Sequence, residues 1–312
     1  MTPSRRLAAL RSGKTALWLL LALAPAALGA QQTTLHLNVK LVNVFVSVTN
    51  KNGAPVGGLT RDDFAVFEDG RPQKIAVFER VTTMPLNLSL AIDTSGSVRK
   101  DLPSEAAAAH RFASILLRPQ DRMSIIEFSD MVHELTPFTN NMKFIDRGLR
   151  QLRPGTATAF YNALVYGVDR LGVREGRRVL VVISDGNDDV DEDTYPQALK
   201  HALNNDVMIY SLIDVPILAS AGRSIGGEHA MITLSEQTGG RYFYIDQGGL
   251  DEAFQHVSED LRTQYLIAYY PRHEYPGMNF HRIEVTMPKA APGAYHLRYR
   301  TGYYTNEPES SH

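Results

Sequence analysis

The fold class is decided by a stretch in the middle of the chain, VLVVISDG at residues 179–186. Its first five residues are apolar without alternation, which is typical of a central parallel strand that is covered on both faces. Its last three residues put a carboxylate, Asp185, where the strand ends. A second stretch, LNLSLAIDTSGS at residues 86–97, has the same layout and puts Asp93 at the end of its apolar run. The sequence therefore predicts two buried strands that each end in a carboxylate.

Outward from these stretches, strand-like runs alternate with helical patterns. Further strands are predicted at residues 123–128, 207–213 and 242–245. Helices are predicted at residues 104–117, 142–152, 160–171, 195–204, 228–237 and 250–262. Alternating strands and helices imply right-handed crossovers, so we expect an α/β fold with an open, doubly wound, mostly parallel sheet. Such sheets bind ligands beyond the carboxyl ends of their strands.

Oxygen-bearing side chains gather at that predicted edge. Asp93, Ser95 and Ser97 alternate along the chain, so an extended turn can direct three side-chain oxygens at one point. Gly96 lets the backbone bend tightly between them. Carboxylates and hydroxyls are hard ligands that suit Mg²⁺ or Mn²⁺. The residues predict a divalent-cation site, and they leave the choice among Mg²⁺, Mn²⁺ and Ca²⁺ open.

The stretch DTSGS, residues 93–97, resembles the DxSxS signature of the metal-ion-dependent adhesion site in von Willebrand factor type A (VWFA) domains. In that family a threonine from a later loop and an aspartate after a later strand complete the site. The segment GTATAFYNAL, residues 155–164, is similar to the threonine segment, and SDG, residues 184–186, is similar to the aspartate segment. All three occur in the family's order. The resemblance implies one Rossmann-like type A domain over residues 85–262.

By this resemblance, the hydroxyls of Ser95, Ser97 and Thr158 contact the metal, and Asp93 and Asp185 act mostly through bound water. Thr156 competes for the threonine role, and spacing to the following helix favours Thr158. The sixth metal position is then filled by an Asp or Glu carboxylate of a protein partner. The implied function is metal-dependent binding or adhesion, with no enzymatic activity.

The segments on either side of this domain resemble those of secreted bacterial VWFA-related proteins. There a segment like LTRDDF, residues 59–64, precedes the domain and a tyrosine-rich β segment follows it. Asp69-Gly70 marks a hairpin turn, with the strand that contains residues 75–78 expected on its far side. Strands are also expected at residues 264–270, 280–287 and 295–300. We expect residues 34–83 and 264–305 to pair into one small β-sandwich-like domain.

The first 30 residues predict export. Four basic residues lead into an apolar run from Ala16 that ends in small residues before Gln31, as in a secretory signal peptide. Its removal would change the formal net charge from −2 to −6 and place the protein outside the cell or in the periplasm. A retained N-terminal membrane anchor is the alternative, and no later stretch has the length of a membrane-spanning helix. The charge balance predicts no nucleic-acid partner, and the oligomeric state stays open.

The absence of cysteine excludes disulfides, thiolate metal sites and cysteine nucleophiles. The ten histidines show no ligand spacing, so we expect them on the surface or in the core. The acidic run at residues 188–193 lacks the glycine of a calcium loop and is expected to be solvated.

Two other functions stay open. The stretch GRSIG, residues 222–226, satisfies the GxSxG pattern of a serine hydrolase, with Ser224 as nucleophile and His256 or His273 after it. It follows a loop rather than a strand end, which argues against a hydrolase. Alternatively, the metal is purely structural and the protein is a component of an envelope assembly.

Overall fold

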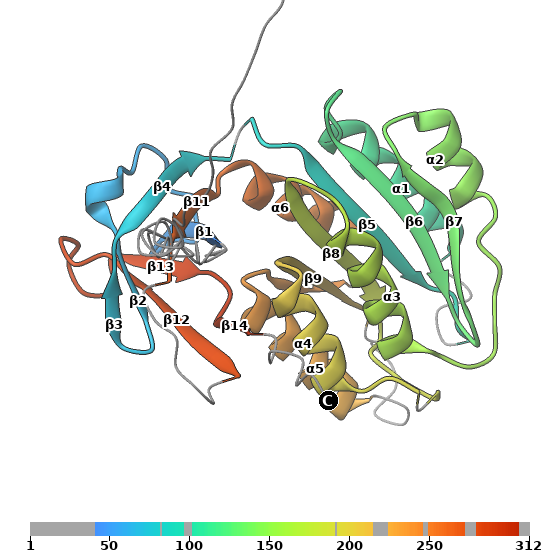
Figure 1. The fold of residues 1–312 in the computed structure, drawn as a ribbon. Helices are drawn as coiled ribbons and strands as arrows, with labels where there is room; N and C mark the ends of the chain where they lie inside the picture. Colours follow the sequence, from blue (N-terminus) through green and yellow to red (C-terminus); the bar gives the residue numbers. More distant parts are fainter. Residues whose placement is uncertain are drawn as a thin grey trace, which may run out of the picture. The chain divides into compact units, whose positions relative to one another are not determined.

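Six strands form the central sheet of the protein, in the order β10-β9-β8-β5-β6-β7 (Figure 1). The computed structural model describes residues 41–81, 83–96, 102–190, 192–214, 224–245, 249–271 and 279–305. The bounds of the six strands are β5 Leu86–Asp93, β6 Arg122–Phe128, β7 Val132–Thr139, β8 Arg177–Ser184, β9 Val207–Asp214 and β10 Tyr242–Ile245. All neighbouring strands are parallel except β6 and β7. Strands β5 and β8 lie at the centre, and every residue of β5 is buried.

Helices cover both faces of this sheet, which confirms the predicted doubly wound fold class (Figure 1). One face packs against α1 (Leu102–Leu116), α2 (Met142–Leu149) and α6 (Leu250–Arg262). The other packs against α3 (Phe160–Gly172), α4 (Tyr195–Asn204) and α5 (Ile225–Thr238). Because both faces are covered, the central strands carry apolar residues in succession rather than in alternation.

The edge strand β7 is missing from the sequence prediction. It runs antiparallel to β6 with two register shifts, and its outer side has no neighbouring strand among the described elements. Its sequence, VHELTPFT, is half exposed and contains Pro137, a residue that sheets tolerate only at edges or bulges. Such a strand has neither a continuous apolar run nor clean alternation, so the pattern does not identify it.

The flanking segments form two further four-stranded sheets, each of which combines strands from both flanks. Their orders are β13-β1-β11-β4 and β14-β12-β2-β3. The strands are β1 Val42–Asn50, β2 Ala65–Glu68, β3 Arg71–Gln73, β4 Ile75–Arg80, β11 Tyr265–Tyr269, β12 Phe280–Thr286, β13 Tyr295–Arg298 and β14 Gly302–Tyr304, with a 3-10 turn at Arg61–Asp63. Their inward side chains make one apolar core, which includes Val44, Val66, Ile267 and Val285. The two sheets therefore pack face to face as a small sandwich.

The hairpin at Asp69-Gly70 differs from the prediction in its second strand. Both turn residues have positive φ, as the Asp-Gly pair indicates, and β2 pairs with β3 across the turn. The expected partner, the strand that contains residues 75–78, instead pairs with β11 in the other sheet. The chain changes sheets at Lys74, and such a crossing is invisible to a local turn signal.

Buried polar contacts join the sandwich to the six-stranded domain, and all the described residues fall in one compact unit, Val39–His312. Asp260 on α6 accepts a hydrogen bond from the Tyr210 hydroxyl at 2.6 Å and pairs with Arg298 of β13 at 2.5 Å. Burial and the charge of Asp260 raise the pKa of Tyr210 well above its usual value, so this hydroxyl stays a donor. Arg300 pairs with Asp206, which lies two residues after the end of α4.

The membrane-related predictions concern residues outside this description. The proposed signal peptide, residues 1–30, lies among the residues that the structure does not describe. Within the described ranges no helix combines the length and apolar character needed to cross a membrane.

Helix α6 is held to α1 by stacked rings, and this contact generates a stability prediction. The rings of Phe112 and Phe254 lie parallel within 13°, with centroids 4.2 Å apart, and Phe254 is 2% exposed. Phe254→Ala should lower the free energy of unfolding by about 3–5 kcal/mol because it leaves a core cavity. Urea unfolding measures this loss. Phe144→Ala, at a ring that is 49% exposed, should change stability far less. Equal losses in the two variants would contradict this placement of the core.

Candidate metal centre

The pairing of β5 with β8 brings Asp93 beside Ser184. The register aligns Ile92 with Ile183, so both strands end at the same edge of the sheet. The Ser184 hydroxyl donates to Asp93 Oδ2 at 2.6 Å, and the Ser95 backbone N–H donates to Asp93 Oδ1 at 2.9 Å. Asp93, Ser95 and Ser184 are all buried. Sequence reasoning did not give Ser184 a role, although it lies within the SDG motif.

Asp185 follows directly after β8 and is also buried. Its Oδ1 accepts the Asn187 backbone N–H at 3.0 Å, and its Oδ2 accepts the Asn187 side-chain amide at 2.9 Å. Burial raises the pKa of Asp93 to about 6, and the negative charge of Asp185 acts in the same direction. Hydrogen bonds from Ser184 and Ser95 act in the opposite direction. Two carboxylates are thus held close together in a poorly solvated place, where a cation would favour their ionised forms.

The loop before α3 reaches the same edge. The Gly155 backbone N–H donates to the Thr94 carbonyl at 2.8 Å, and the Asp189 backbone N–H donates to the Thr158 carbonyl at 2.8 Å. These two bonds join the threonine loop to the segments that follow β5 and β8. Thr158 is 2% exposed. The described part of the chain therefore gathers Asp93, Ser95, Thr158 and Asp185 at one edge, and Ser97 lies outside the described residues.

The two candidate threonines are separated by their partners. Thr156 is exposed, and its hydroxyl donates to Asp130 Oδ1 at 2.6 Å. Asp130 also accepts the backbone N–H groups of Thr156 and Ala157. The bond from the Thr156 hydroxyl, followed by these backbone bonds, lowers the pKa of the Asp130 carboxyl. Asp130 thus fixes the loop from outside and keeps the Thr156 hydroxyl occupied. This arrangement favours Thr158 over Thr156 as the candidate metal ligand. The sequence gives no signal for Asp130, because it lies 26 residues from Thr156 along the chain.

The acidic run at residues 188–193, expected to be solvated, also binds the start of α3. Asp188 Oδ1 accepts the backbone N–H of Phe160 at 2.7 Å, so it caps the first turn of α3 from a distant loop. Glu192 accepts the side-chain amide of Asn162 at 2.7 Å. Asp191 lies outside the described residues. These contacts hold the start of α3, and with it Thr158, against the segment that follows β8.

Ser224, the nucleophile of the hydrolase hypothesis, occupies the N-cap of α5. Its hydroxyl oxygen accepts the Gly227 backbone N–H at 3.2 Å, which explains the serine by helix capping. Helix α5 consequently begins at Ile225, three residues before the predicted start. His256 lies on α6 near Glu252 and Glu259 of its own helix, and His273 lies outside the described residues.

The start of α5 packs closely against the loop that contains Asp185. Gly186 has φ +79°, and a Cβ placed on it would lie 2.6 Å from the Gly227 carbonyl carbon. A Cβ on Gly227 would lie 1.7 Å from the Gly186 carbonyl oxygen. Two glycines therefore allow backbone-to-backbone contact directly behind the candidate site.

The donor set fits a hard divalent cation. It consists of buried hydroxyl and carboxylate oxygens, with few formal charges, at the carboxyl ends of two central strands. Mg²⁺ and Mn²⁺ prefer oxygen ligands, and Mg²⁺ keeps several waters in its shell. A site with few direct protein ligands suits that behaviour.

The glycine contact yields a second prediction with a matched control in the same helical turn. Gly227→Ala should destabilise the protein, since its Cβ would collide with the Gly186 carbonyl, and should displace the loop that carries Asp185. Gly226→Ala meets no atom within 4 Å and should be neutral or stabilising by about 0.5–1 kcal/mol. Urea unfolding of both variants gives the comparison. A stable Gly227→Ala variant would contradict the close approach.

Comparison with known proteins gave a matching family model and several similar solved structures. Residues 88–187 match the family model of the von Willebrand factor type A domain. No curated protein matches the chain. Solved structures that resemble it include the conserved hypothetical protein BatB from Bacteroides thetaiotaomicron, at 19% identity and TM-score 0.46, covering 56% of this chain and 97% of that one.

Two other similar solved structures are von Willebrand factor domains by name. The von Willebrand factor type A protein from Catenulispora acidiphila is 12% identical, with TM-score 0.48 and coverage of 77% of this chain and 73% of that one. The vWF domain of the type V pili tip protein Mfa5 from Porphyromonas gingivalis is 14% identical, with TM-score 0.45 and coverage of 62% and 98%. The matched segment runs from β5 to the loop after β8 and contains the candidate site. The chain therefore contains a von Willebrand factor type A domain.

Proposed function

We propose that the protein is an exported binding protein that recognises an acidic group of a protein partner through a Mg²⁺-type cation. The observation that carries the proposal is the buried carboxylate of Asp93, which lies near Asp185 where the central strands end. Buried residues with hydroxyl groups, Ser95, Thr158 and Ser184, lie at the same edge. A type A domain supports a protein-binding role for the chain. The predicted signal peptide supports export.

Within this proposal, Ser95, Ser97 and Thr158 hold the cation through their hydroxyls. Asp93 and Asp185 orient its bound waters. Neutral hydroxyl ligands leave much of the ion's charge uncompensated, so an incoming carboxylate gains a strong electrostatic interaction. The cation supplies that attraction, and the protein supplies a rigid cradle: β5 and β8 fix the aspartates, while Asp130 and Asp188 fix the threonine loop.

The proposed role is binding rather than catalysis. The serine that suggested a hydrolase caps α5, and its hydroxyl oxygen accepts a backbone hydrogen bond. Near Asp93, the Ser184 hydroxyl donates to the Asp93 carboxylate and the Thr94 hydroxyl donates to the Phe128 carbonyl.

Metal binding is tested by a pair of threonine variants. Mg²⁺ or Mn²⁺ at about 100 times the dissociation constant should stabilise the metal-free protein by about 2.7 kcal/mol, because it binds only the folded state. Thr158→Val should abolish this increment. Thr156→Val should keep it, since that hydroxyl is bonded to Asp130. Thermal unfolding with metal and with chelator measures the difference.

The outcomes separate the hypotheses. Loss of the increment in Thr156→Val alone would make Thr156 the ligand. No increment in the wild-type protein, in a sample shown to be metal-free, would refute the cation site. Loss of the increment in Ser97→Ala would extend the ligand set to that residue.

Partner recognition is tested with the same variants. A partner captured from the producing cell's envelope and surroundings should bind the wild-type protein in Mg²⁺, release in chelator, and bind Thr158→Val at least tenfold more weakly. Metal-dependent stability together with capture that is indifferent to metal would instead favour a structural metal in an envelope assembly.

A further inference from the structure

A second cluster of metal-ligating side chains lies in the β sandwich, outside the six-stranded sheet that carries Asp93. Glu68 ends β2, Asp69 begins the following turn, and His281 lies on β12. Strands β2 and β12 are antiparallel, with Glu68 opposite Ile283. The backbone N–H of Asp69 donates to the Arg282 carbonyl at 3.0 Å, which seats the turn over β12. Each residue offers one ligand atom, and the three atoms lie within 4.8 Å of one another.

Glu68 is oriented by two tyrosines from different strands. The hydroxyls of Tyr269 on β11 and Tyr303 on β14 both donate to Oε2, at 2.6 and 3.0 Å. The other oxygen, Oε1, is buried and has no hydrogen-bond partner among the described residues. Glu68 is 1% exposed. A buried carboxylate oxygen without a donor is costly, so this atom calls for a ligand.

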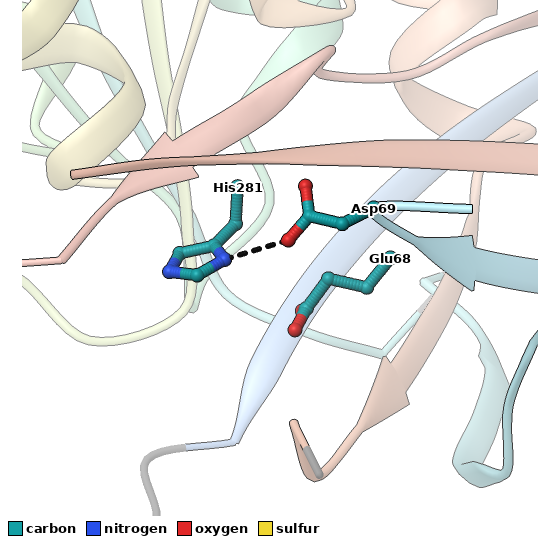
Figure 2. Close-up of side chains that lie close together, drawn as sticks. All are labelled: Glu68, Asp69 and His281. Carbon is teal, nitrogen blue, oxygen red and sulfur yellow. Dashed lines mark hydrogen bonds and ion pairs between the residues drawn. The ribbon is translucent and has the colours of Figure 1, made fainter. Parts of the chain in front are cut away.

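Asp69 and His281 complete the arrangement. The Arg282 backbone N–H donates to Asp69 Oδ1 at 2.9 Å, which leaves Oδ2 facing His281 Nδ1 at 2.8 Å. Figure 2 shows the two carboxylates and this ring nitrogen turned toward a common region. The imidazole ring stacks on Tyr303, with centroids 5.2 Å apart, and is thereby fixed in plane. Asp69 thus has one oxygen held by a backbone donor and the other facing His281, whereas Glu68 has one oxygen held by two tyrosine hydroxyls and the other without a hydrogen-bond partner among the described residues.

No described cationic side chain pairs with Glu68. The guanidinium of Arg300 lies 5.7 Å from the centre of the Tyr303 ring, and its ion pair is with Asp206. Two carboxylates at a largely buried place need positive charge to be stable in ionised form. The cluster therefore has the ligands for a cation and the orienting hydrogen bonds that metal ligands usually receive.

We propose that Glu68, Asp69 and His281 bind a divalent transition-metal ion of the Zn²⁺ type. One imidazole nitrogen with two carboxylates suits Zn²⁺ or a related first-row ion, whereas Mg²⁺ prefers oxygen ligands alone. Zinc lies about 2.1 Å from nitrogen and oxygen ligands, so tetrahedral ligand atoms lie roughly 3.4 Å apart. The present separation of Asp69 Oδ2 from His281 Nδ1, 2.8 Å, is shorter than that value, and all three ligand atoms lie within 4.8 Å of one another, so small side-chain shifts would accommodate the ion. The Asp69 side chain is 13% exposed and provides the side of entry.

The alternative is an Asp69–His281 ion pair with no metal, in which the imidazolium carries the positive charge. Both arrangements hold β2 against β12. They differ in whether the protein takes up a transition metal at this place.

The test is zinc titration by isothermal calorimetry into the full chain carrying Thr158→Val, in excess Mg²⁺, so that the site near Asp93 does not contribute. One equivalent of Zn²⁺ should bind and raise the unfolding temperature. Glu68→Gln keeps an acceptor for both tyrosines and should bind zinc at least tenfold more weakly, as should His281→Gln. His296→Gln, at an exposed histidine of β13, should bind like the parent.

Co²⁺ provides an independent readout. Its visible absorption bands should report nitrogen and oxygen ligation in the parent and in His296→Gln, and should be lost in His281→Gln. Circular dichroism checks that Glu68→Gln is folded. Zinc binding of equal strength in the parent, Glu68→Gln and His281→Gln, or no zinc binding in the parent, would overturn the proposal and leave the metal-free ion pair.

Discussion

The parallel pairing of β5 with β8 is the constraint on which the rest of the molecule depends. It is the middle of the six-stranded sheet, it is buried on both faces, and its register makes the two strands end together. Because they end together, Asp93 meets the Ser184 hydroxyl at 2.6 Å, and Asp185 follows at once. Helices α3 and α5 then begin beside this edge, so their first turns and capping loops enclose it. A shift of either strand by one residue would turn every side chain to the opposite face and separate the two aspartates.

This constraint explains how much the sequence could reveal. Buried parallel strands read as continuous apolar runs, so β5, β8 and β9 were predicted within one or two residues of their bounds. The same reasoning placed Asp93 and Asp185, since a residue at the end of a predicted strand needs no further information to be located, and Ser95 follows two residues after Asp93. The prediction failed for two strands. The edge strand β7 is half exposed, and β4 crosses to another sheet one residue after β3. The choice between Thr156 and Thr158 depends on Asp130, which only the folded chain brings near.

The histidines also show that local sequence patterns do not reveal contacts between distant segments. No histidine of the sequence has the spacing of a metal ligand, and this criterion applies to sites within one helix or one hairpin. His281 meets Asp69 over 212 positions, through the antiparallel pairing of β2 with β12. No motif can encode such a cluster, because its spacing is the length of an inserted domain. The tyrosine-rich character of the C-terminal segment was the available signal, and two of those tyrosines, Tyr269 and Tyr303, orient Glu68.

The two candidate cation sites differ in their ligands and therefore in the role that a bound ion would have. Near Asp93, oxygen ligands of low total charge would keep a hard ion attractive to a carboxylate from outside, as we propose. In the sandwich, an imidazole and two oriented carboxylates lie close together at a largely buried place. The sandwich is small and its halves are separated by the type A domain, although the Val81 backbone N–H and the Gln264 carbonyl meet at 3.2 Å where that domain begins and ends. The chain has no cysteine with which to cross-link the halves. A ligand that binds only the paired strands stabilises them by mass action, so a transition metal at Glu68, Asp69 and His281 would do for this sandwich what a disulfide does for many small β domains.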